Sequence, residues 1–146
     1  MTQPGGLGPE EQKELVDSLA TLVRETAPEA WQRISIEYKC IGRHVELGVG
    51  CKNAAGEQIA WELPTETDTI FWRLRVGMYR EGLGTWFSAF FRMRQPGEYE
   101  IFYNHDNEPP WGAEPGSFIK EQDLFPRDDE HTPDWFRRRL AEASST

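Results

Sequence analysis

The side chains best suited to chemistry in this chain are a histidine and two carboxylates in close succession, His105, Asp106 and Glu108. A histidine beside a carboxylate can transfer protons in acid–base catalysis, and the same groups are ligands for zinc. A metal site needs three or four ligands that converge, and only these three cluster locally. Isolated loop histidines are more often simply hydrated. A small hydrolase or metal enzyme centred on His105 is therefore the third of three hypotheses.

Other catalytic patterns are missing from the sequence. It contains no nucleophile elbow, zinc-protease helix motif, phosphate-binding loop or dinucleotide fingerprint. Gly82 and Gly84 are too close together to enclose a phosphate and are better explained as a helix stop. Cys40 and Cys51 should face inward on adjacent strands, too far apart for a disulfide, as free thiols in a reducing compartment. We expect no catalytic residue, no metal and no cofactor.

The charge of the chain is large and unevenly distributed. Its 146 residues carry a formal net charge of −9, which argues against nucleic acid or an anionic membrane as the partner. Residues 71–95 hold five Arg against one Glu, whereas residues 98–130 hold ten acidic residues against Lys120 and Arg127. The acidity is thus concentrated in the second half of the chain, where it favours a basic protein partner or serves solubility alone.

The acidic segment has two interpretations. It keeps a surface loop hydrated, or it forms a negative platform around Trp111 that recognises a positively charged partner. An aromatic anchor surrounded by charge suits fast and tight recognition, because the field accelerates encounter and the ring supplies buried contact. The predicted partner-binding residues are Asp106, Asn107, Glu108, Trp111, Asp123, Asp128, Asp129 and Glu130.

Length and composition indicate one domain. We expect a flexible polar tail at residues 1–8 and a single α+β domain at residues 9–142. The first residues show no basic region followed by an apolar run, and no stretch approaches the length of a membrane helix. A cytoplasmic location is therefore the expectation.

In the first half of the chain, the spacing of apolar residues changes from that of a helix to that of a strand. Apolar residues at three- and four-residue spacing predict a helix from Pro9 to a point before Pro28. Alternation then predicts strands over residues 33–40 and 45–51, and a third at 59–63. Together these strands suggest a three-stranded antiparallel meander.

A helix and a hairpin are predicted next. The helix begins at Thr65, with its apolar side inward and Arg75 among the arginines that point elsewhere. The hairpin joins residues 85–94 to residues 98–103 through a Pro-Gly turn. Phe87 shares one face with the core partners, while Trp86, Phe90 and Phe102 fall on the other. We expect a helix to cover that second face, which would otherwise be a sticky surface.

The remainder is predicted as loops and short elements anchored by Phe118, Leu124 and Phe125, followed by a last helix from about Thr132. The expected fold is therefore α+β. It has an N-terminal helix, an antiparallel sheet of about five strands with a helix before its hairpin, and C-terminal loops with a short helix.

Several strings in this order resemble one family. APEAWQRISIEYKCIG at 27–42 and GLGTWFSAFFRMRQPGEYEIFYNHD at 82–106 are similar to the strand entry and the hairpin of the YezG-like immunity proteins. Pro109-Pro110-Trp111, Asp123-Leu124-Phe125-Pro126-Arg127 and Pro133-Asp134-Trp135 resemble the C-terminal motifs of actinobacterial relatives. The chain departs from that pattern at Asn104-His105, where a more acidic strand end is typical.

The resemblance implies an antidote that binds the toxic domain of a polymorphic or contact-dependent toxin and occludes its active site. Some similar sequences accompany NAD-glycohydrolase or nuclease toxins. This immunity function is the leading hypothesis. The alternative is a general protein–protein interaction module that uses the strand-face aromatics Trp86 and Phe90.

Overall fold

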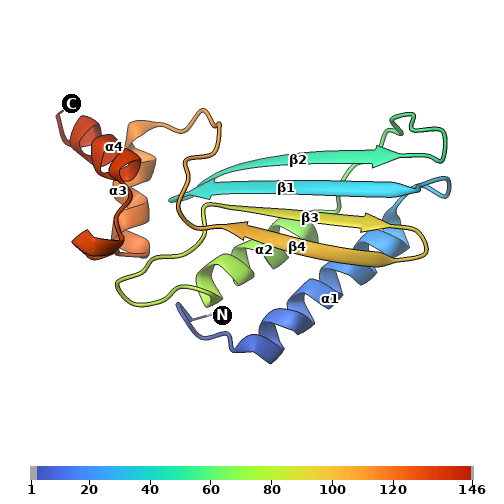
Figure 1. Ribbon diagram of the computed structural model, residues 1–146, viewed down its shortest axis with the longest axis horizontal. Coiled ribbons are helices and arrows are strands. Elements are labelled where there is room, and N and C mark those ends of the chain that lie inside the picture. Colours follow the sequence, from blue (N-terminus) through green and yellow to red (C-terminus); the bar gives the residue numbers. More distant parts are fainter. Residues whose placement is uncertain (1–2, 146) are drawn as a thin grey trace.

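The computed structural model describes residues 3–145, in which two pairs of strands are each preceded and followed by a helix (Figure 1). None of the helices in this range is long and apolar enough to cross a membrane. In chain order the elements are α1 (Pro9–Thr26), β1 (Arg33–Ile41), β2 (His44–Lys52), α2 (Glu66–Gly77), β3 (Ser88–Arg94), β4 (Glu98–Asn104), α3 (Pro115–Leu124), the 3-10 helix η1 (Asp129–His131) and α4 (Asp134–Ser144).

The strands form one antiparallel sheet in the order β2-β1-β3-β4. The α+β class is confirmed, but the described chain has four strands in this sheet where about five were expected. Residues 59–63 form no strand, and only an isolated bridge from Lys52 to Gln58 continues the pairing of β2. Ile59, Trp61 and Leu63 instead pack against the core as partly buried side chains. The alternation of apolar residues correctly predicted that these side chains face the core, but a segment can do so without hydrogen bonding to a neighbouring strand.

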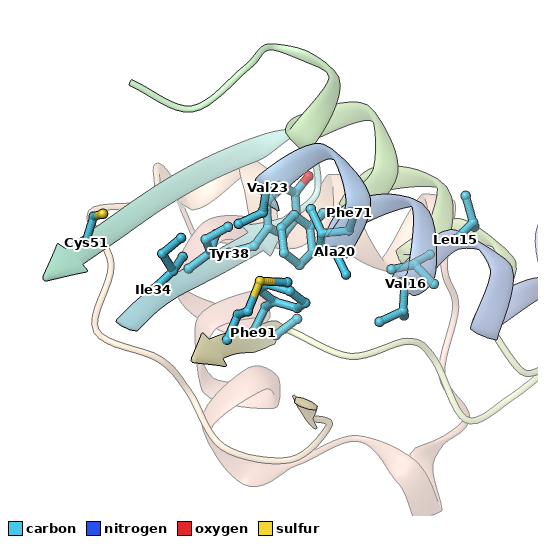
Figure 2. Close-up of a cluster of buried hydrophobic side chains, with 14 of the residues drawn as sticks. Leu15, Val16, Ala20, Val23, Ile34, Tyr38, Cys51, Phe71 and Phe91 are labelled. Carbon is cyan, nitrogen blue, oxygen red and sulfur yellow. The ribbon is translucent and has the colours of Figure 1, made fainter. Parts of the chain in front are cut away.

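One face of the sheet is covered by α1 and α2 (Figure 1). The predicted stripe of α1 is confirmed, since Leu15, Val16, Leu19 and Val23 are all buried. Figure 2 shows Val23 and Ala20 of α1 beside side chains of the sheet, among them Tyr38, whose ring stacks on Phe71 of α2 at 4.9 Å between centroids. Burying such side chains is the main favourable contribution to folding.

The two cysteines lie on the covered face, as predicted. Cys40 pairs with Val45 in the β1–β2 register, whereas Cys51 pairs with Ile34 at the other end of the strands. Both are buried free thiols.

The uncovered face of the sheet differs from the expectation in two ways. Trp86 is completely buried in the main core, where its ring contacts Tyr38 and Tyr103, because ladder pairing with β1 begins only at Ser88. The side chains before Ser88 therefore need not alternate between the two faces of the sheet as those of β3 do. Phe90 and Phe102 do lie on the second face, but no helix of residues 3–145 covers them, and they are 36% and 49% exposed.

A second, smaller core lies at one end of the sheet, where α3 and α4 pack together (Figure 1). Its buried members are Ile41, Phe87, Phe118 and Phe136. The segment predicted as short elements thus contains a ten-residue helix, α3. The inward anchors Phe118 and Phe125 are confirmed as buried.

The predicted flexible tail is partly docked. Residues 1 and 2 lie outside the described residues, but the backbone N–H groups of Gly5 and Leu7 donate to the carbonyls of Val76 and Gly77 at 3.0 and 3.2 Å. Leu7 rests directly on Gly77, where even a methyl group would collide with it. Residues 5–7 therefore lie against the end of α2.

Candidate protein-binding surface

The centre of the acidic region is a buried cation, Arg127. Its Nη2 atom donates to the backbone carbonyls of Thr85 and His105 at 2.9 and 3.0 Å, and its Nη1 atom donates to the carbonyl of His131 at 3.0 Å. The guanidinium also lies over the ring of Phe87, at 4.5 Å from the centroid. One side chain therefore holds together three segments that are distant in sequence.

Close approach of the backbone makes room for this side chain. Gly84 has a φ of +80°, and a Cβ there would lie 2.1 Å from Nε of Arg127. The positive φ and the contact both require glycine at this position. Gly82, predicted as part of a helix stop, accepts a hydrogen bond at its carbonyl from the N–H of Asp128 at 2.8 Å.

The segments joined by Arg127 carry exposed carboxylates. Asp106 follows His105 directly, and its backbone carbonyl accepts a hydrogen bond from Nε1 of Trp135 at 2.7 Å. The other three carboxylates belong to Asp128, which immediately precedes η1, and to Asp129 and Glu130 within η1. The exposed acidic residues of this surface, which we call the acidic surface, are Asp106, Asp128, Asp129 and Glu130.

Two residues of the predicted platform serve intramolecular contacts instead. Oε2 of Glu108 accepts hydrogen bonds from Nε1 of Trp111 at 3.0 Å and from Nε of Arg139 at 2.8 Å. Trp111 is half-buried, and its ring makes edge contacts with Phe87 and Phe118 in the second core. One carboxylate oxygen of Glu108 and much of the Trp111 ring are therefore engaged within the chain.

The remaining two predicted residues differ in their setting. Asn107 is exposed, and its backbone N–H and carbonyl both bond the side chain of Asn104, at 3.0 and 2.7 Å. This arrangement orders the loop that carries Asp106. Asp123 is an exposed residue of α3, and its side chain forms no hydrogen bond or ion pair with any of residues 3–145.

Among residues 3–145, no hydrogen bond joins the imidazole of His105 to Asp106 or Glu108. The backbone carbonyl of His105 bonds Arg127, and burial lowers the pKa of its imidazole while Asp106 acts in the opposite direction. No three His, Cys, Asp or Glu side chains of residues 3–145 come together as ligands for a metal ion.

A buried ion pair supports the same end of the molecule. Arg75 and Glu121 are buried and joined by a hydrogen bond of 2.6 Å between Nη2 and Oε2. Arg75 was expected to point away from the core, so this is a correction. Burial acts to lower the pKa of Arg75, but the carboxylate of Glu121, together with Cys40 and Tyr38, raises it by more, and the pKa lies above its ordinary value. The guanidinium therefore stays charged inside the protein.

The structural residues that sequence reasoning missed are thus three charged ones, Arg75, Glu121 and Arg127. A charged residue with no oppositely charged residue nearby in the sequence is predicted to lie on the surface, since buried charges are rare unless they are paired. A single sequence signal pointed to Arg127, namely Gly84, whose missing side chain leaves room for it.

Comparison with known proteins adds no identity to this geometry. Neither a protein-family model nor a curated protein matches the sequence.

Proposed function

We propose that this protein is an antidote that binds a toxin domain in a stoichiometric complex and occludes its active site. The observation that carries the proposal is the acidic surface: four exposed carboxylates are gathered from two segments by one buried arginine. The resemblance to the YezG-like immunity proteins supplies the choice of a toxin as the partner.

The acidic surface suits a basic cleft for an electrostatic reason. Clustered charges of one sign steer a complementary partner and raise the association rate. Arg127 and Asn104 order the two carboxylate-bearing segments before binding, so less conformational entropy is lost in the complex. A toxin that acts on NAD or on a nucleic acid must itself attract phosphates, and its cleft would present the opposite charge.

The direct test uses the toxin domain that the proposal expects to be encoded by the open reading frame beside this chain. Expression of that domain alone should arrest growth, and co-expression of this chain should restore it. Calorimetry on the purified proteins should give a 1:1 complex whose affinity falls with added salt. Growth arrest that co-expression leaves unchanged, together with no binding, would contradict the proposal.

The general interaction module remains the alternative, in a changed form. Trp86 is buried and unable to contact a partner, but Phe90 is exposed beside Phe102 on the uncovered face. If the toxin binds normally when the acidic surface is neutralised, that uncovered face becomes the first place to look for its interface.

A further inference from the structure

The uncovered sheet face has a regular chemical order that differs from the acidic surface. Because antiparallel partners lie side by side, the register arranges the outward side chains in rows across the strands. The row farthest from α3 and α4 is Lys52, Arg33, Arg94 and Glu98. The next row is Gly50, Ser35, Arg92 and Glu100, and the third is Gly48, Glu37, Phe90 and Phe102.

Three cations lie directly opposite one another in the first row. Arg94 is paired with Glu98 at 2.8 Å, but the side chains of Arg33 and Lys52 have no charged or hydrogen-bonding partner among residues 3–145. Like charges at opposed positions of neighbouring strands destabilise a sheet. Repulsion within this row therefore lowers the stability of the fold, and a bound ligand of opposite charge would relieve the repulsion.

The same residues line a depression. An open hollow of about 530 Å³ lies over the first two rows. Its walls include four cations and two carboxylates, namely Arg33, Lys52, Arg92, Arg94, Glu98 and Glu100. Ser35 and Gly50 are also among its lining residues, and the Ser35 hydroxyl lies where a side chain at position 50 would begin, 2.9 Å from a Cβ there. Phe90 borders the hollow on the side of the third row.

We infer that this basic hollow binds a short acidic segment of a partner protein. Carboxylates of the segment would accept hydrogen bonds from Arg33 and Lys52, and an apolar side chain would rest on Phe90. The first and third rows are four residues apart along a strand, which is about 14 Å at about 3.4 Å per residue. The matching segment is extended, with its acidic residues about four positions from an apolar one.

The charges of the face favour a protein segment over a nucleic acid. Arg92 and Arg94 are already paired with Glu100 and Glu98, so only two cations remain for a ligand. Glu37 also faces outward in the third row and would repel a continuing chain of phosphates. Two free cations followed by an aromatic row fit a segment that carries one or two carboxylates and then an apolar group.

The test uses the purified full chain and a fluorescein-labelled peptide with Glu at two alternate positions and a Phe four positions after the first Glu, so that all three side chains share one face of an extended segment. Fluorescence polarisation should show binding that weakens with salt, and a matched peptide with Gln in place of Glu should bind about tenfold more weakly. Equal binding of the two peptides would overturn the inference. A labelled eight-residue thymidine oligonucleotide that bound more tightly than the Glu peptide would also overturn it, in favour of nucleic acid.

A variant locates the site. Arg33→Gln with Lys52→Gln should weaken peptide binding about tenfold, whereas Lys120→Gln with Arg138→Gln, the same charge change on α3 and α4, should leave it unchanged. The first variant should unfold at the same temperature as the native chain or a higher one, since opposed cations are removed. Peptide binding that both variants reduce equally would refute this location. No toxin is needed in these measurements, so their failure would leave the proposed antidote function standing.

Discussion

Nη2 of Arg75, on α2, lies 2.6 Å from Oε2 of Glu121, on α3, and neither side chain is reached by solvent. The pair joins more than two helices. Nε of Arg75 donates to the carbonyl of Trp86 at 3.0 Å, and Oε1 of Glu121 accepts from the N–H of Gly42 at 2.8 Å. It thereby connects the main core to the C-terminal helices that carry part of the acidic surface.

Breaking this pair should be strongly destabilising. Glu121→Ala leaves an uncompensated buried charge, and we expect the free energy of unfolding to fall by about 3 to 5 kcal/mol. Arg75→Met combined with Glu121→Leu should cost less than Glu121→Ala, because neither charge of the pair is left buried without its partner. Lys13→Ala, which removes an exposed pair with Asp17, should cost less than about 1 kcal/mol. Urea denaturation measures all three, and similar losses for Glu121→Ala and Lys13→Ala would contradict the argument.

The turn between β1 and β2 should tolerate only glycine at position 42. Gly42 has a φ of +61°, and a Cβ there would lie 2.5 Å from the carbonyl oxygen of Ser117. Gly42→Ala should therefore cost about 1 to 3 kcal/mol or more. Gly116→Ala, in α3 with open space around its Cβ, should instead stabilise the protein by up to about 1 kcal/mol. Thermal unfolding compares the two, and equal effects would show that the turn is not the cause.

Arg127→Lys should loosen the acidic surface while keeping the charge. A lysine has no planar fork with which to bond the carbonyls of Thr85, His105 and His131 together. We expect a loss of about 2 kcal/mol or more in stability and faster amide exchange over residues 104–108. Arg138→Lys, at an exposed site of α4, serves as the control and should change neither quantity. Unchanged amide exchange over residues 104–108 in Arg127→Lys would mean that this loop is ordered without the hydrogen bonds of Arg127.

Neutralising the acidic surface should weaken toxin binding. Asp106→Asn, Asp128→Asn and Glu130→Gln together keep the side-chain shapes, and we expect the Kd to rise about tenfold or more, mostly through slower association. The salt dependence of Kd should also become shallower. The matched control is Glu14→Gln, Glu25→Gln and Glu29→Gln, three exposed residues outside this surface. Surface plasmon resonance separates the rates, and equal losses in both triple variants would indicate a general charge effect.

Stability should decline at alkaline pH. Burial raises the pKa of the Cys40 thiol to about 11 and that of the Tyr103 hydroxyl to about 12. Folding therefore favours the protonated forms, and their contribution is complete below the ordinary pKa of each group and lost as pH rises through the folded value. Urea denaturation should give a steady free energy of unfolding up to about pH 8 and a fall between pH 9 and 12. Cys40→Ala should make the fall shallower, and an unchanged slope would exclude Cys40 as a contributor.

The elements whose patterns are local could be predicted well. The apolar stripe of α1 and the alternation in β1, β3 and β4 each report one inward side, and that side is the one in the structure. In β2, at the edge of the sheet, Cys51 is buried as expected, but Leu47 and Val49 are each 40% exposed. The separation of Cys40 from Cys51 also follows from the hairpin alone. The acidic residues at 106 and 128–130 were identified as an acidic region, but nothing in their spacing showed that they share a surface.

What the sequence by itself determined is therefore the α+β class, the faces of the regular elements and the position of the acidity. Only the tertiary structure decided that 59–63 is not a strand, that α3 is a helix and that Arg75 and Arg127 point inward. The reason is that a buried charge is stabilised by a distant partner. Arg75 and Glu121 are 46 residues apart, and Arg127 and Thr85 are 42 apart. A local pattern treats each of these charged side chains as surface, and the inward position of Glu121 also removes the apolar stripe that would have predicted α3.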